Sequence, residues 1–284
     1  MSHGGSEFIS FTLGETHVSI PWIPQFAGVG IEILLILGLI LLYTYRKNSS
    51  GMVLFDSIFE KVYAFFEEIL GEETKSWVKN FVTTLFFVIL FSNLLGLMIE
   101  FIAPIFGTNE EGHLLLEGFI GSPTTDLNFN IGMAIIGVLV VLVMQAKSLG
   151  IGGFIHDYFP IMGKGYLPYE KGKLPPVIDY PAWAIIKVFD IILSLFLGLL
   201  EVIGTLAKIV SLSFRLFGNM TSGATLIVML YVALGGITAG IVGLQLPLGV
   251  PILIYLQELL VSLIQAFVFP LLIAIFVKVA ITHD

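Results

Sequence analysis

Residues 187–222 read KVFDIILSLFLGLLEVIGTLAKIVSLSFRLFGNMTS. Polar side chains recur in this apolar run at steps of 3, 11, 7, 7, 4 and 3 residues: Lys187, Asp190, Glu201, Lys208, Arg215, Asn219 and Ser222. An α-helix turns about 100° per residue, so each step rotates the side chain by no more than about 60°. The stretch therefore predicts an apolar helix with one polar line along it. A charge inside a bilayer costs about 2.5 kcal/mol or more, so the polar line indicates an ion route.

Some members of the polar line also have simpler explanations. Lys187 and Asp190, three residues apart, are consistent with an ion pair at the membrane interface. Lys208 is also explained as a structural counter-charge to Glu201. The hydroxyl groups of serines in a helix often bond to carbonyl groups of the same helix, which applies to Ser211, Ser213 and Ser222.

Arg215 is the member of the polar line that is hardest to explain by structure alone. No acidic residue lies within two helical turns of it in the sequence. Arginine stays charged in proteins, and an unpaired buried guanidinium is very costly. Arg215 therefore requires a partner that its own helix does not supply, and another subunit is one possible source.

The composition of the whole chain is that of an integral membrane protein. Hydrophobic residues make up 57% of the 284 residues and charged residues 12%, whereas soluble domains carry about 25% charged residues. There is no cysteine, which excludes disulfides and cysteine-based metal sites. The 13 Lys and Arg residues are mostly scattered singly, unlike a nucleic-acid-binding surface. We expect no metal site, no cofactor and no nucleic-acid partner.

We predict an all-α fold with about five transmembrane helices and one interfacial amphipathic helix, in a single membrane domain, 1–284. A span needs roughly 20 apolar residues, and the first span is expected to be retained because no cleavage signal follows it. Residues 53–70 alternate apolar and polar side chains at helical spacing, as in a helix lying in the membrane interface; packing on another domain is the alternative. The expected segments are an external N-terminal segment at 1–25, span 1 at 26–45, the interfacial helix at 51–72, span 2 at 77–103, span 3 at 127–147, a long tilted helix at 180–235 and a final helix at 250–281.

Basic residues set the expected orientation. They follow the first and third spans and the end of the last: Arg46, Lys47, Lys61, Lys75, Lys147, Lys164, Lys171, Lys173 and Lys278. Lys and Arg concentrate on the cytoplasmic side, so we expect a multi-pass protein of the plasma or inner membrane with its N-terminus outside and its C-terminus in the cytoplasm.

As one helix, 187–222 would be roughly 54 Å long, against a hydrocarbon core of about 30 Å. Two upright spans there would put Lys278 outside, so we predict one long, tilted or bent helix that forms a hairpin with the final helix.

The final helix carries a second polar face. Tyr255, Glu258, Ser262 and Gln265 recur at helical spacing. Glu258 fits a channel carboxylate, or alternatively a carboxylate that only reaches to the interface. The loop after span 2 carries the acidic residues Glu110, Glu111 and Glu117. With Glu100, Asp126 and Asn128, it predicts an outer vestibule that concentrates cations. Ordinary loop solubility explains the same charges.

These residues resemble subunit a of bacterial F-type ATP synthases. The most specific match is the run Ser211-Leu-Ser-Phe-Arg-Leu-Phe-Gly-Asn-Met220. Further matches follow the family's order over about residues 80–280: Asn93-Leu-Leu-Gly-Leu97, Asp126 with Asn128, Gly150-Ile-Gly-Gly-Phe154 and Leu263-Ile-Gln-Ala-Phe-Val-Phe269.

The resemblance implies roles for single residues. Arg215 matches the family's essential arginine, which faces a rotor ring of small hairpin subunits. The family's polar channel positions match Glu201, Lys208, Ser211, Asn219 and Gln265. One departure is Ala224, where many members carry His or Glu; the facing position on the last helix, often His, is Glu258 here. The channel carboxylate is therefore expected on the last helix.

The resemblance also implies the partners: the rotor ring, a peripheral-stalk membrane subunit, the lipid bilayer and H⁺ or Na⁺ as the transported ion. It implies no catalytic chemistry in this chain itself. Two other classes compete with this reading. A secondary transporter would bind its substrate at the midplane between repeated halves, but the sequence has no internal repeat. A structural scaffold would not need the polar line.

Overall fold

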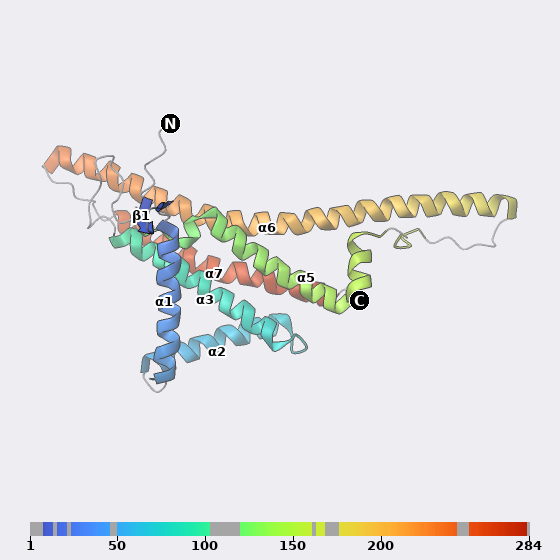
Figure 1. Cartoon of the computed structure of the whole chain (residues 1–284), viewed down its shortest axis with the longest axis horizontal. Coiled ribbons are helices and arrows are strands. Elements are labelled where there is room, and N and C mark those ends of the chain that lie inside the picture. The colour runs from blue at the N-terminus through green and yellow to red at the C-terminus, as the bar shows by residue number, and fades with distance from the viewer. Residues whose placement is uncertain are drawn as a thin grey trace. The chain divides into compact units, whose positions relative to one another are not determined.

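A computed structural model of the chain describes residues 8–13, 16–21, 24–45, 50–102, 120–160, 163–167, 176–242 and 250–282. The predicted all-α membrane body is confirmed, and a two-stranded hairpin that we did not predict precedes it. Strands β1 (Phe8–Leu13) and β2 (Thr16–Pro21) are antiparallel. The remaining elements are α1 (Pro24–Tyr45), α2 (Ser50–Leu70), α3 (Ser76–Ile102), the 3₁₀ turn η2 (Pro123–Thr125), α5 (Leu127–Tyr158), α6 (Pro176–Val242) and α7 (Val250–Thr282) (Figure 1).

Four of the described helices are long and apolar enough to cross a membrane: Ser76–Ile102, Leu127–Tyr158, Asp179–Ile227 and Ile252–Thr282. A shorter apolar stretch, Phe26–Leu41, lies in α1. The basic residues Arg46, Lys47, Lys171 and Lys173, on which the predicted orientation partly depends, lie outside the described residues. The orientation of the termini stays a prediction.

The described residues fall into two compact units. Unit 1 consists of Met1–Asn130 and Phe214–Leu272, and unit 2 consists of Ile131–Ser213 and Ile273–Asp284. Unit 1 thus holds α1 to α3 with the second part of α6 and most of α7. Unit 2 holds nearly all of α5, the first part of α6 and the end of α7.

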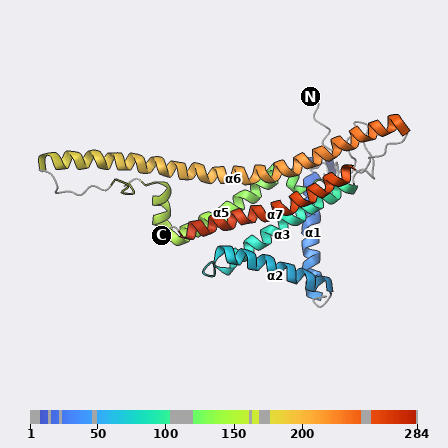
Figure 2. The same cartoon turned by 180° about the vertical axis from the view of Figure 1, so that it is seen from behind.

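In unit 1, the amphipathic helix α2 packs its apolar face against α3 (Figure 2). Phe59 stacks on Phe87 with ring centroids 5.5 Å apart, and the fully buried Phe66 lies 6.4 Å from Phe86. The side chains that α2 buries recur at helical spacing: Met52, Val62, Phe66 and Leu70. Packing within unit 1 accounts for these buried residues, whereas Val53, Leu54 and Ile58 stay exposed. The location of α2 in the membrane interface stays a prediction.

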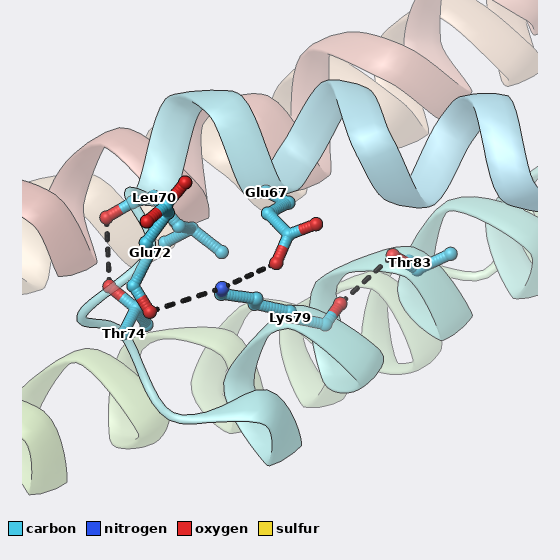
Figure 3. Close-up of polar contacts among 6 residues, drawn as sticks. All are labelled: Glu67, Leu70, Glu72, Thr74, Lys79 and Thr83. Carbon is cyan, nitrogen blue, oxygen red and sulfur yellow. Dashed lines mark hydrogen bonds and ion pairs between the residues drawn. The ribbon is translucent and has the colours of Figure 1, made fainter.

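The turn between α2 and α3 is fixed by one buried lysine (Figure 3). Gly71 ends α2 with a φ of 86°, which only glycine adopts readily. The Lys79 ammonium then donates to Glu67 Oε1 at 2.7 Å and to the carbonyl of Glu72 at 3.4 Å. The Thr74 hydroxyl donates to the Leu70 carbonyl at the end of α2, at 2.8 Å.

In unit 2, α5 continues past the predicted end of span 3 at residue 147. Gly150 has φ 71° and ψ 163°, so two helical segments meet at a kink there. Glycine tolerates this conformation because it has no Cβ. The kink turns the last eight residues of α5, 151–158, away from a straight continuation and positions the polar side chains described below.

Helix α6 has 67 residues and is unbroken at Lys208. A helix of this length is about 100 Å long along its path, more than three times the roughly 30 Å of a hydrocarbon core. It therefore cannot be one upright span over its whole length. Its tilt relative to a membrane stays a prediction.

Candidate functional site

Arg215 lies on the part of α6 that belongs to unit 1, and its side chain is exposed. The apolar face of the same stretch is buried, with Leu216 at 0% and Met220 at 1% exposure, so the guanidinium points away from that packing. In the part of the chain that the structure describes, no hydrogen bond or ion pair reaches Arg215. The described residues therefore supply no partner for this charge.

Glu258 on α7 lies directly against the backbone of α6 in unit 1. A Cβ built on Gly223 would be 2.0 Å from Glu258 Oε1, and the Glu258 side chain is only 5% exposed. The absence of a side chain at Gly223 therefore makes room for the carboxylate. Both residues belong to unit 1. The side chain of Ala224, which we expected opposite Glu258, lies outside the described residues.

Ser262 and Tyr255 of α7 contact α3 or α6 within unit 1. Ser262 is fully buried, and its hydroxyl lies 3.9 Å from Met220 Sδ. Its backbone carbonyl accepts a 3.3 Å hydrogen bond from Asn93 Nδ2. The Tyr255 hydroxyl donates to the backbone carbonyl of Glu100 at 2.9 Å. These contacts hold the polar face of α7 against α3, and the same face carries the buried Gln265.

Asp126, one of the predicted vestibule residues, has a local structural role. Asp126 precedes α5, and its Oδ1 accepts a 2.8 Å hydrogen bond from the N–H of Asn128. Asp126 is therefore the N-cap of α5: its carboxylate accepts from an N–H in the first turn, which has no acceptor within the helix. The Asn128 side chain is exposed. Glu110, Glu111 and Glu117 lie outside the described residues.

Unit 2 contains a small cavity of about 50 Å³ between α5, α6 and α7, lined by both polar and apolar side chains. We call it the inner cavity. Lys208 approaches it with its ammonium 5.0 Å from the ring centre of Phe276, which is cation–π geometry. Among the described residues, Lys208 and Glu201 form no ion pair. The lining consists of Val138, Val141, Leu142, Gln145, Tyr158, Glu201, Thr205, Lys208, Phe276, Val279 and Ala280.

Asp190 and Lys187 come together, as their spacing predicted. Lys187 Nζ lies 3.7 Å from Asp190 Oδ2. The buried Asp190 carboxylate also accepts hydrogen bonds from the N–H groups of Gly165 at 3.2 Å and Leu167 at 3.3 Å. Asp190 therefore anchors the segment 163–167 to α6 in addition to pairing with the lysine.

Comparison with known proteins identifies the family. The ATP synthase A chain profile matches residues 28–278, most of the chain. The chain belongs to the ATP synthase A chain family. It is 27% identical over 294 residues to "ATP synthase subunit a" of Pelodictyon phaeoclathratiforme, with 95% of this chain and 71% of that protein covered. It is 24% identical over 249 residues to "ATP synthase subunit a, sodium ion specific" of Propionigenium modestum, covering 84% and 69%.

A third relative shows that some family members are matched only in part. The chain is 30% identical over 158 residues to "ATP synthase subunit a" of Actinobacillus pleuropneumoniae, covering 56% of this chain and half of that protein. With its long apolar helices, family membership makes the chain a multi-pass membrane protein.

The residues that match the family's motifs differ in exposure and in the unit to which they belong. Arg215 and Ser211 are exposed on α6, and Asn219 is partly exposed. Glu201 is exposed and lines the inner cavity together with Lys208. Unit 1 thus contains Arg215, Asn219, Glu258, Ser262 and Gln265, whereas unit 2 contains Glu201, Lys208 and Ser211.

Sequence reasoning missed three residues of these sites. Gly223 has no signal of its own, because its importance depends on Glu258, which is 35 positions later. Gln145 lies two residues before Lys147, so its position in the sequence indicates only the polar end of span 3. Tyr158 lies beyond Gly150, where we expected a loop. Gln145 is neutral, so the rule that marks ionisable residues inside a membrane as functional candidates does not select it.

Proposed function

We propose that this chain is the ion-conducting stator subunit of a rotary F-type ATP synthase. Family membership supports an ion-translocating role. The stator role is supported mainly by Arg215. This residue is a permanent charge on an apolar helix; its side chain is exposed and has no partner among the described residues. A partner with a carboxylate on a neighbouring subunit would satisfy it.

The mechanism follows from the cost of charge in lipid. A carboxylate on a rotor ring of small hairpin subunits must be neutral while it passes through lipid. It must ionise once per passage, between a half-channel that delivers ions and one that removes them. Arg215 at that point stabilises the ionised carboxylate and blocks direct ion flow. At an effective dielectric near 20, a 4 Å pair is worth about 4 kcal/mol, strong enough to form and weak enough to be released.

In this proposal, unit 1 contributes the outer half-channel and unit 2 contributes the inner half-channel. The outer half-channel uses the buried polar face of α7 in unit 1, with Glu258 as its ionisable group and Glu100 and Asp126 near its entrance. The inner half-channel uses the inner cavity of unit 2, with Glu201 and Lys208. The role of Asp126 as an N-cap means that it also stabilises α5.

The proposal leaves the ion as H⁺ or Na⁺. A relative named as sodium-ion specific is 24% identical to this chain, and other relatives carry no ion in their names. We further propose a peripheral-stalk membrane subunit as a second partner, with the N-terminus outside and the C-terminus in the cytoplasm.

The test is purification of the chain from its native membrane in mild detergent. We expect it to co-purify with a ring of small hairpin subunits that carry a midmembrane carboxylate. Reconstituted alone, the chain should transport no ion. A secondary transporter would move its substrate without a ring, and a scaffold would have no ring partner, so either result would reject the proposal.

A further inference from the structure

A row of hydrogen-bonded side chains in unit 2 runs from α6 to the segment after α5. The Tyr158 hydroxyl donates to Gln145 Oε1 at 3.1 Å and lies 3.4 Å from the hydroxyl of Thr205. Gln145 Nε2 donates to Asp157 Oδ2 at 3.0 Å. Asp157 Oδ1 accepts from the Lys164 ammonium. The row thus joins a neutral hydroxyl on α6 to a partly exposed ion pair.

The kink at Gly150 makes this row possible. Gln145 and Tyr158 are 13 residues apart, which would separate them by roughly 20 Å along a straight helix. The non-helical backbone at Gly150 returns Asp157 and Tyr158 to the side of Gln145. One structural explanation is therefore that Gln145 and Asp157 simply fasten the end of α5.

That explanation does not account for Tyr158. Its side chain is 9% exposed and that of Gln145 is 6% exposed, so two polar side chains are buried within unit 2. A polar group that is buried without a hydrogen-bond partner is costly, and the Tyr158 hydroxyl finds both of its partners, Gln145 and Thr205, on the lining of the inner cavity. The Tyr158 hydroxyl points to Thr205, which is one turn from Glu201 on the cavity wall.

The inner cavity has the size and the lining to hold water. A cavity needs about 10–15 Å³ of probe-occupied volume for one water molecule, together with polar partners. The inner cavity has about 50 Å³, and its polar lining comprises Gln145, Tyr158, Glu201, Thr205 and Lys208. It therefore has room for more than one water molecule, and its lining offers polar partners.

We propose that Tyr158 and Gln145 are positioning residues of the ion pathway: with Thr205 they hold the water in the inner cavity beside Glu201 and Lys208. The partly exposed Asp157–Lys164 pair forms the end of this row that is farthest from Thr205. The inference rests on the proposed function, because it assigns these residues to the inner half-channel.

The first experiment tests whether the inner cavity contains water. The chain has no cysteine, so a single Ala280→Cys variant places one thiol on the cavity wall. Ala274→Cys is the matched control: it lies on the same helix, is fully buried and does not line the cavity. A thiol needs water to ionise and react. In the assembled complex in inverted membrane vesicles, we expect Ag⁺ to modify Ala280→Cys at least about tenfold faster than Ala274→Cys. Equal rates in the two variants, or an unreactive thiol in Ala280→Cys, would overturn the proposal.

The second experiment tests the hydroxyl. Tyr158→Phe keeps the ring and removes one hydrogen-bonding group, which typically corresponds to about a two- to tenfold effect. We expect ATP-driven pumping to fall by that factor and, when Tyr158→Phe is combined with Ala280→Cys, Ag⁺ modification of the thiol to slow. A purely structural role for Tyr158 would leave the modification rate unchanged. Tyr166→Phe, at an exposed tyrosine outside the cavity, should change neither quantity. Wild-type pumping and modification in Tyr158→Phe would overturn the assignment.

Failure of this inference is distinguishable from failure of the proposed function. Thiol modification is read directly on the chain by mass spectrometry and does not depend on pumping. An unreactive thiol in Ala280→Cys, in a complex whose pumping still requires Arg215, rejects only the hydrated cavity. Pumping that does not require Arg215 rejects the proposed function itself.

Discussion

Gly223→Ala places a methyl group where the Glu258 carboxylate lies. The added Cβ would meet Glu258 Oε1 at 2.0 Å, whereas ordinary contacts begin at 3.4 Å. The carboxylate must therefore move by about 1.4 Å, the difference between these two distances. The atoms that must yield are the end of a flexible side chain, so the fold should survive.

The substitution is expected to lower transport clearly and stability only modestly. Overpacking of a core lowers the free energy of unfolding by about 1–3 kcal/mol. Replacing Gly by Ala in a helix raises it by up to about 1 kcal/mol. A displacement of about 1 Å at a reacting group, in contrast, costs up to about a hundredfold in rate. We therefore expect ATP-driven ion pumping to fall about ten- to hundredfold while the complex still assembles.

The assay is ATP-driven ion uptake in sealed vesicles, with the amount of assembled complex measured in parallel. Gly132→Ala is the control, because a Cβ there would meet no atom within 4 Å. Shortening the acid in Gly223→Ala with Glu258→Asp should restore part of the rate. Wild-type pumping by Gly223→Ala would refute the reasoning, because it would mean that the position of the Glu258 carboxylate does not matter.

Two further predictions concern stability and topology. Lys79→Met removes the ammonium that joins α2 to α3 at 2.7 Å. Since Glu67 is 42% exposed and remains hydrated, we expect a loss of about 1–2 kcal/mol, seen as a lower unfolding temperature in detergent; an unchanged temperature would contradict the role of this pair. A thiol at Lys173→Cys should react only from the cytoplasm and one at Gly240→Cys only from outside, and labelling of both from the same side would rule out the predicted orientation.

Local patterns in the sequence predicted the helices well. The spacing of apolar residues in 53–70 predicted the amphipathic α2, because its buried face follows the 3.6-residue period. The long α6 followed from an apolar run with no strong breaker between Lys187 and Ser222. The spacing of Lys187 and Asp190 likewise predicted their contact, since residues three apart share a helix face.

Other features were missed because a local signal was misread. Gly150 reads as a helix end, but α5 continues beyond it after a kink. The segment 8–21 alternates apolar and polar residues around Gly14 and Glu15, which is a hairpin pattern, and we described it only as an external segment.

The contacts within the candidate sites depend on tertiary packing. Gly223 and Glu258 are 35 residues apart, and no periodicity connects a glycine on one helix to a carboxylate on the next. Tyr158 reaches Gln145 and Thr205 only because α5 kinks and α6 lies beside it within unit 2. Sequence reasoning could identify Glu258 by its charge, but not the residue that makes room for it.

The most direct test of the stator function is ATP-driven ion pumping by Arg215→Ala. The exposed guanidinium has no partner among the described residues of this chain, so its removal should leave folding and assembly intact. Lys278→Ala, at an exposed lysine near the end of α7, serves as the control and should pump normally. We predict an assembled complex in which Arg215→Ala abolishes coupled pumping. Pumping retained by Arg215→Ala would contradict the account.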